Sequence, residues 1–164
     1  MTTAQAPTQA PRRAVLPPRW VIRAAWIIHR AIYNISGGRR GLREPTATDW
    51  GMMRLRTVGR RSGRERIAIL AYFWDGPNVV TMAMNGWGDP EPAWWLNIQA
   101  RPDVVVDLPD GPRAVRGRVA TADERPALWE RWAAFNGPNQ ASYAARRSRE
   151  TAVVILEPRD SAVR

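Results

Sequence analysis

The pattern of apolar and polar positions predicts a sheet of short strands interrupted by helices. Residues 49–58 alternate, with Met53 and Leu55 expected on a covered face and Arg54 and Arg56 on an exposed one. A half-exposed strand shows this alternation, because successive side chains point to opposite faces of a sheet. Other runs predict strands at 67–74, 79–84, 104–108, 113–119 and 151–158.

Two hairpins are expected among these strands. The run at 67–74 is apolar throughout, which favours a strand covered on both faces, and the turn at 75–78 leads from it into the next strand. A second hairpin spans 104–122, with Pro, Asp and Gly at its turn, residues 109–112. The pattern therefore predicts mainly antiparallel pairing.

Three stretches carry helix signals. Residues 19–35 combine an apolar face with a basic stripe, and residues 92–100 begin at a proline. The third helix, at 123–135, is preceded by Thr121 and Glu124, which stand three residues apart as in a capping box.

The segment between the two hairpins has the most distinctive composition. Residues 85–88 are expected to form a loop, Asp89 to cap the helix that follows, and Pro102 to end it. Trp94 and Trp95 are adjacent and cannot point in one direction on a helix, so one is expected in the core and the other towards a ligand. The alternative is that both belong to the core.

Length and composition indicate one domain. A chain of 164 residues can enclose a core without metal or disulfide support, and this chain has no cysteine. We expect a single domain over 19–158, a disordered Pro-, Ala- and Thr-rich arm at 1–18 and a tail at 159–164. The only histidine, His29, is expected on a helix surface, so neither a Ser-His-Asp site nor a metal site is predicted.

Positive charge is concentrated in the first part of the chain. Residues 1–66 hold 14 arginines and three acids, a balance of +11, so the remainder of this +10 chain carries −1. This asymmetry implies an anionic partner, which could be the phosphates of a cofactor, anionic lipid or nucleic acid. The complete absence of lysine also allows codon bias as an explanation of the arginine content.

The helix at 19–35 leaves two interpretations open. It is too short and too charged to span a bilayer, but its tryptophans and basic stripe suit a membrane interface. It could equally pack on the domain's own sheet with its arginines in solvent.

The turn GRRSGRER at 59–66 has the composition of an anion site. Gly59 and Gly63 permit a tight turn with outward-pointing backbone amides. Guanidinium groups match phosphate oxygens in geometry and charge. The arginines around the turn are Arg60, Arg61, Arg64 and Arg66. A solvated basic turn is the competing interpretation.

Three motifs together resemble a known family. They are GRRSGRER, the Asp75-Gly76 hairpin turn, and PAWWLNIQARPDVVVDL at 92–108. In this order and spacing they resemble the deazaflavin-dependent nitroreductase and quinone reductase family, which carries GRxSGxxR and PxWxxNLxAxP. The resemblance runs from about Trp20 to Pro158.

The resemblance implies a fold and a cofactor. The fold would be α+β, a split β-barrel of the FMN-binding-protein type with six or seven antiparallel strands and peripheral helices. Such a protein binds coenzyme F420, an 8-hydroxy-5-deazaflavin, and passes hydride from its C5 carbon to a quinone, an enone or a nitro compound.

The resemblance also assigns coenzyme-binding residues. The anionic tail would meet Arg60, Arg61, Ser62 and Arg66, and the strand at Ile67 and Ala68 would lie along the coenzyme. The ring would be lined by Met82, Ala83, Met84 and Asn85. The next wall would consist of Ala93, Trp94, Trp95, Leu96 and Asn97.

The acceptor would stack above the ring, held between the ring, Trp26 or Trp87, and Tyr143. Tyr143 would polarise or protonate it, although solvent could serve equally well. Nitro-reducing members of the family present several tyrosines here, whereas this chain keeps only Tyr143 and has Gln140, counted with the coenzyme-binding residues, at another of those places. A quinone or enone is therefore favoured over a nitro compound.

Ring and tail contacts also depart from the family. Ile69 replaces a common proline, Met84 a common serine and Asn85 a common lysine. One of the family's contacts to the ring or the tail is therefore expected to be missing.

Other functions remain open from the sequence. The protein could carry the coenzyme without catalysis, or use FMN on the same barrel. Nucleic-acid binding is ranked last, because no motif that reads nucleic acid is present. The chain is expected to be a monomer or homodimer, cytoplasmic or peripheral at the inner face of the cell membrane.

Overall fold

The computed structural model describes residues 41–137 and 140–159 of the chain. The arm at 1–18 and the helix at 19–35, with Trp26, lie outside these residues and stay predictions. The described strands are β1 (Gly51–Val58), β2 (Glu65–Asp75), β3 (Asn78–Met82), β4 (Asp103–Leu108), β5 (Gly111–Val119) and β6 (Val153–Pro158). The described helices are the 3-10 turn η1 (Asn85–Trp87), α2 (Ala93–Ala100), α3 (Arg125–Asn136) and α4 (Gln140–Ala144).

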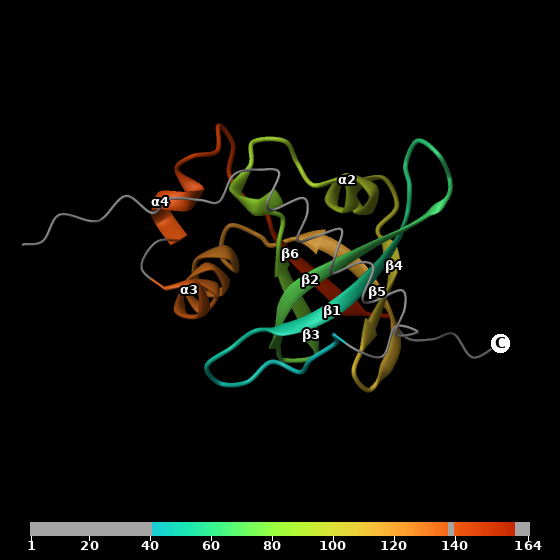
Figure 1. Ribbon diagram of the computed structural model, residues 1–164, viewed down its shortest axis with the longest axis horizontal. Coiled ribbons are helices and arrows are strands. Elements are labelled where there is room, and N and C mark those ends of the chain that lie inside the picture. The colour runs from blue at the N-terminus through green and yellow to red at the C-terminus, as the bar shows by residue number, and fades with distance from the viewer. Residues whose placement is uncertain (1–40, 138–139, 160–164) are drawn as a thin grey trace, which may run out of the picture.

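The six strands form a closed antiparallel barrel in the order β1-β2-β3-β6-β5-β4 (Figure 1). Pairing of β1 with β4, in which Arg54 lies opposite Asp107, closes the barrel. The helices lie outside it, with α3 and α4 together on one side and α2 along the upper edge of the view. The predicted split barrel with peripheral helices is confirmed.

Apolar and polar side chains alternate along β1, so that every second side chain points into the barrel interior. Met53 and Leu55 are fully buried, whereas Arg54 and Arg56 on the opposite face pair with Asp107 of β4. The same interior cluster holds large residues from the other strands and from α2. The faces predicted for this strand are confirmed.

A second cluster lies between the barrel and α3. Trp132 of α3 is buried against Phe73 of β2, and it stacks on Trp50 with ring centroids 5.6 Å apart. In the 67–74 run, Ile69, Tyr72 and Phe73 are buried and the other residues are half-buried. Leu70, Tyr72 and Trp74 pack on the interior cluster, and Ala71 and Phe73 pack on this second cluster. Both faces are therefore covered over 70–74, as predicted, whereas Ile67 and Ala68 are only half-buried.

The predicted capping box is confirmed. The backbone N–H of Glu124 donates to Oγ1 of Thr121 at 3.3 Å, and the N–H of Thr121 donates to Oε2 of Glu124 at 2.8 Å. Arg118 of β5 also binds the Glu124 carboxylate through both terminal nitrogens. The start of α3 is thereby fixed to the barrel wall.

The helix α2 lies very close to β5. A Cβ atom on Gly117 would come within 2.7 Å of Cγ2 of Ile98, so only glycine leaves room for this helix. None of the helices in the described part of the chain has the length and apolar character of a membrane span.

Candidate coenzyme and acceptor site

The 59–64 turn between β1 and β2 is closed by its own backbone. Gly59 donates its N–H to the carbonyl of Arg64 at 2.8 Å and accepts the N–H of Gly63 at the same distance. Gly63 has a φ of 65°, in the left-handed region that favours glycine. A Cβ on Gly59 would lie 2.7 Å from Oγ of Ser62, so both glycines are required by the shape of the turn.

The arginines of this turn remain available to a ligand. Arg60, Arg61, Arg64 and Arg66 are all exposed, and within residues 41–137 and 140–159 none of them forms a salt bridge. Arg66 reaches only Oγ of Ser62, at 3.4 Å. Most arginines on the barrel strands are instead paired with acids, as Arg56 is with Asp107. The turn therefore concentrates positive charge that the described part of the protein does not neutralise.

A buried asparagine connects this turn to α2. Asn97 is only 4% exposed, and its Oδ1 accepts the backbone N–H of Arg60 at 3.1 Å. Its Nδ2 donates to Oγ1 of Thr57 at 3.0 Å, and the Thr57 hydroxyl donates to the carbonyl of Arg66 at 3.3 Å. One chain of hydrogen bonds thus fixes both ends of the turn to the helix.

The two tryptophans of α2 differ in burial. Trp95 is buried in the interior cluster, whereas Trp94 is half-buried and packs against the same cluster, with ring centroids 6.3 Å apart. A ligand contact at Trp94 stays a prediction. Ala93 is exposed, and Leu96 is half-buried. Part of the Trp94 ring therefore remains accessible to a ligand.

The segment between β3 and α2 contains consecutive residues in left-handed conformations. Asn85, Gly86 and Trp87 have φ values of 47°, 60° and 61°. For residues other than glycine this conformation is strained and requires support from the surroundings. The Asn85 side chain provides one support, since its Nδ2 donates to the carbonyl of Pro90 at 2.8 Å.

The predicted cap of α2 was wrong. The residue that precedes the helix is Pro92, and no side chain caps it. Asp89 instead accepts the backbone N–H of Ser148 at 2.6 Å, a contact that lowers the pKa of the Asp89 carboxyl. Asp89 therefore binds a residue that is distant in sequence and does not cap the helix.

An aromatic group surrounds Trp87. Its indole stacks on Tyr143 of α4 with centroids 5.9 Å apart and planes 26° apart, and Trp129 of α3 meets it edge-on at 6.4 Å. Because the buried Trp87 stacks directly on Tyr143, no flat molecule fits between them, and the prediction that the acceptor lies between Trp87 and Tyr143 is wrong. The structure thus unites two of the three residues predicted to contact the acceptor.

The remaining predicted residues have mixed positions. Met82 and Ala83 are buried on different sides of the barrel wall, whereas Met84, Ile67 and Ala68 are half-buried. Gln140 is buried, and its Nε2 donates to the backbone carbonyl of Trp129 at 3.1 Å. Gln140 therefore supports the packing of α4 on α3.

No local pattern in the sequence distinguishes Arg147. It belongs to an arginine-rich stretch at 146–149 that resembles a solvated loop, yet its side chain is completely buried. Only a tertiary contact distinguishes it from its exposed neighbours.

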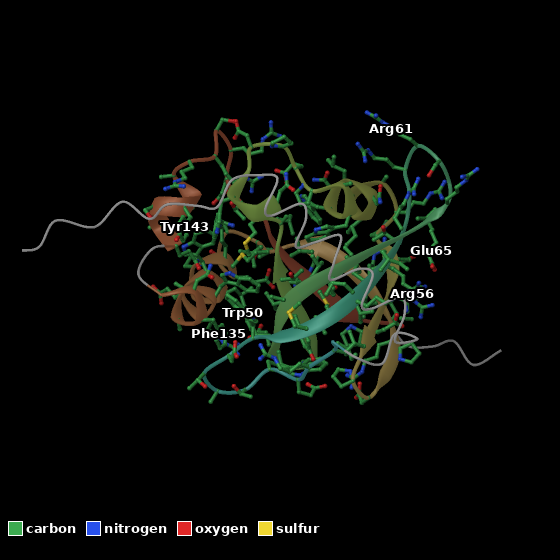
Figure 2. The ribbon with its side chains drawn as sticks, in the orientation of Figure 1. Trp50, Arg56, Arg61, Glu65, Phe135 and Tyr143 are labelled. Carbon is green, nitrogen blue, oxygen red and sulfur yellow. The ribbon has the colours of Figure 1, made fainter. Side chains whose placement is uncertain are left out.

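Figure 2 shows Arg61 at the upper right of the molecule and Tyr143 at its left, and in this view the ribbon of α2 lies between them. The site thus has a basic end at the 59–64 turn and an aromatic end at α4. This donor set fits an elongated cofactor that has an anionic tail and a flat ring. Unpaired guanidinium groups and a glycine turn match the tail, and half-buried aromatic residues match the ring.

Comparison with known proteins gives concordant matches. The family model described as F420H(2)-dependent quinone reductase matches residues 26–158. An F420H(2)-dependent quinone reductase of Mycobacterium tuberculosis is 32% identical over 152 residues, covering 86% of this chain and 97% of the relative.

Solved structures share the barrel. An F420-H2 dependent reductase is 26% identical with a TM-score of 0.57, covering 65% of this chain and 93% of that one. A chain described as a domain-swapped dimer has a TM-score of 0.61 at 22% identity, covering 82% and 99%, and it supports the fold alone.

Proposed function

The chain belongs to the F420H(2)-dependent quinone reductase family. We propose which of its residues bind the coenzyme and which bind the acceptor. The chain is an F420-dependent oxidoreductase with a quinone as acceptor. We infer that the 59–64 turn and α2 bind the coenzyme, while Trp87 and Tyr143 receive the acceptor. The observation that carries this proposal is the unpaired arginine turn, which Asn97 fixes to the helix carrying Trp94.

The turn binds the anionic tail in this proposal. Arg60 and Arg61 present guanidinium groups, and Arg66 adds a third on the strand that follows. Charge-assisted hydrogen bonds to phosphate or carboxylate oxygens are stronger than neutral ones, and they lose strength as salt concentration rises. The tail would therefore provide much of the affinity.

The ring is held between two segments of chain. Residues 82–85 form one wall and the exposed side of α2, including Trp94, forms the other. When bound, the reduced coenzyme supplies the hydride. The protein's contribution is to hold the acceptor at near-contact distance and to exclude water from the reacting atoms.

Tyr143 and Trp87 serve the acceptor. The indole of Trp87 is only 8% exposed and stacks face to face on the half-buried Tyr143, and the Arg146 guanidinium lies 5.5 Å from the centre of the Tyr143 ring. The accessible part of Tyr143 is therefore the aromatic contact proposed for a planar quinone. Reduction of a quinone oxygen also requires a proton, and the Tyr143 hydroxyl is a donor at this contact. Enones share the flat conjugated electrophile and are proposed as further acceptors, with nitro compounds weaker because Tyr143 stands alone.

The test is a titration of the protein with coenzyme F420 and, separately, with FMN. We expect preference for the deazaflavin, and oxidation of its reduced form when menadione is added. Replacing Arg60 and Arg61 together by glutamine should weaken coenzyme affinity roughly tenfold or more, since hydrogen bonds to charged groups contribute about 1.5–3 kcal/mol each. Arg131→Gln is the control, because this exposed arginine on α3 binds Asp75, away from the turn.

Three results would contradict the proposal. Coenzyme binding without turnover of any quinone would indicate a carrier protein. Stronger binding of FMN would indicate a flavin enzyme on the same barrel. Unchanged affinity in the double arginine variant would remove the turn from the coenzyme site.

Membrane contact and oligomeric state are separate questions. Contact of residues 19–35 with anionic lipid would bring the enzyme to membrane quinones, and flotation with liposomes before and after deletion of residues 1–35 tests this. If the shortened protein floats equally well, the helix is not the anchor. Sedimentation distinguishes a monomer from a homodimer.

A further inference from the structure

Arg147, in the segment between α4 and β6, places a guanidinium group in the protein interior. Its side chain is 0% exposed, and its Nη1 donates to the carbonyl of Ala83 at 2.9 Å and to Oγ1 of Thr151 at 2.8 Å. Its Nη2 lies 3.5 Å from Oε1 of Glu91, whose side chain is 14% exposed. One buried cation therefore contacts three separate parts of the chain.

These contacts hold both ends of one loop. Ala83 follows β3 and lies two residues before the strained turn η1, and Glu91 stands immediately before Pro92, the residue that precedes α2. The middle of the loop is held by the same segment, because the backbone N–H of Ser148 donates to Asp89. The loop at 83–91 thus takes its shape from residues 147 and 148.

The loop connects the two proposed walls of the coenzyme site. Residues 82–85 form one wall, and α2 carries the other. Trp87, between them, faces Tyr143, which lies four residues before Arg147. A displacement of the loop would therefore move both walls and the aromatic surface together.

The ion pair is an expensive way to stabilise a fold. Desolvating two charges costs several kcal/mol, and apolar residues of similar size often stabilise a protein as well or better. The pair is also incompletely satisfied, since Nε and Nη2 of Arg147 and Oε2 of Glu91 have no hydrogen-bond partner among residues 41–137 and 140–159. Stability alone does not explain an arginine at this position, whereas the demand for one loop geometry does.

We propose that Arg147 is a positioning residue, which holds the 83–91 loop in the geometry that seats the coenzyme ring and places Trp87 against Tyr143. The proposal rests on the function proposed above. It assigns a role in binding and turnover to a residue that touches neither coenzyme nor acceptor.

The test compares Arg147→Met with Arg147→Lys and with the control Arg131→Met. Arg131 is a matched control, because it also joins a backbone carbonyl, that of Trp74, to a carboxylate, that of Asp75. We expect Arg147→Met to raise the coenzyme Kd and lower kcat with menadione, together by roughly tenfold to a hundredfold, as misplacement of reacting groups does. Arg147→Lys should recover part of the loss, since a lysine donates to the same acceptors. Arg131→Met should leave both constants near those of the wild type.

Glu91→Gln keeps the guanidinium and its bonds to Ala83 and Thr151, so it serves where Arg147→Met does not fold. A raised coenzyme Kd in Glu91→Gln supports the proposal. A lower melting temperature with unchanged Kd and kcat, in either variant, overturns it and leaves Arg147 a structural residue.

One readout does not depend on the coenzyme. Arg147→Met should speed hydrogen exchange at residues 85–88 and reduce the near-ultraviolet circular dichroism of the Trp87–Tyr143 stack, and Arg131→Met should do neither. If the wild type fails to bind deazaflavin, the proposed function fails. The hydrogen-exchange and circular-dichroism measurements then test the positioning role without the coenzyme. If neither changes in Arg147→Met, the positioning role is overturned.

Discussion

Asn97 on α2 accepts the backbone N–H of Arg60 at 3.1 Å, across 37 positions of sequence. This single contact attaches the basic turn to the helix that carries Trp94 and Trp95. It means that the anion-binding end and the ring-binding end of the proposed site are parts of one rigid unit. The first prediction follows from it.

Replacing Asn97 by alanine should weaken both stability and coenzyme binding. The N–H of Arg60 loses its acceptor and Oγ1 of Thr57 loses a donor, and each buried polar group left unsatisfied costs about 1–3 kcal/mol. The measurements are urea unfolding and coenzyme titration. Gln99→Ala, at an exposed position of the same helix, is the control. Equal coenzyme affinity in the two variants would show that coenzyme binding does not require the hydrogen bond between Asn97 and the turn.

The two glycines of the turn should differ in their effects. In Gly59→Ala the new methyl group would lie 2.7 Å from Oγ of Ser62 and 3.2 Å from the carbonyl of Arg64, so the turn must open. Gly63→Ala meets no neighbour within 4 Å and adds only left-handed strain, about 1–2 kcal/mol. We expect coenzyme Kd to rise more in Gly59→Ala, and unfolding free energy to fall in both. Identical Kd values would exclude the shape of the turn as a determinant of binding.

Tyr143→Phe separates the hydroxyl from the ring. The phenyl ring keeps the stack on Trp87, so KM for menadione should change little. If the hydroxyl donates the proton, kcat should fall by about a hundredfold, within the usual contribution of general acid catalysis. Tyr143→Ala should raise KM as well, because the aromatic surface is lost. An unchanged kcat in the phenylalanine variant would assign the proton to solvent.

Glu124 should make stability depend on pH in the acid range. Hydrogen bonds from Arg118 and from the backbone of Thr121 lower the pKa of Glu124 from its usual 4.5 to about 2. A lowered pKa stabilises the folded state fully above 4.5, and this contribution is lost as pH falls from 4.5 towards 2. Glu124→Gln should therefore lower the melting temperature at neutral pH and give a shallower decline below pH 4.5.

The matched control for this variant is Glu130→Gln. Glu130 is exposed on the same helix and forms no salt bridge within the part of the chain that the structure describes. A melting temperature that declines with pH equally in Glu124→Gln and the wild type would contradict the prediction.

Much of the barrel was predictable from local sequence. Alternation placed Met53 and Leu55 inside, turn residues located both hairpins, and Thr121 with Glu124 located the start of α3. These signals are local, because side-chain periodicity and capping involve residues only a few positions apart. Order and spacing of the motifs then indicated the family, which the comparisons confirm.

Local reasoning failed where a distant group competed for the same atom. Asp89 was predicted to cap α2, but the helix begins at Ala93, so that Asp89 lies three residues before the cap position at Pro92 and accepts the N–H of Ser148 instead. In sequence, Arg147 does not differ from its exposed neighbours, yet it donates to the carbonyl of Ala83. Gln140 was predicted to contact the ligand, and in the structure it donates to the carbonyl of Trp129. No periodicity encodes contacts of this kind.

By itself, the sequence determined the class of fold, the glycine turn with its four arginines, and the presence of aromatic residues between the two hairpins. Tertiary structure alone decided that Asn97 joins that turn to α2, that Trp87 stacks on Tyr143, and that Arg147 is buried against the 83–91 loop. The physical reason is the range of the forces involved. Backbone conformation responds to near neighbours along the chain, whereas the burial of a charge and the partner of a polar atom depend on which surfaces the closed barrel brings together.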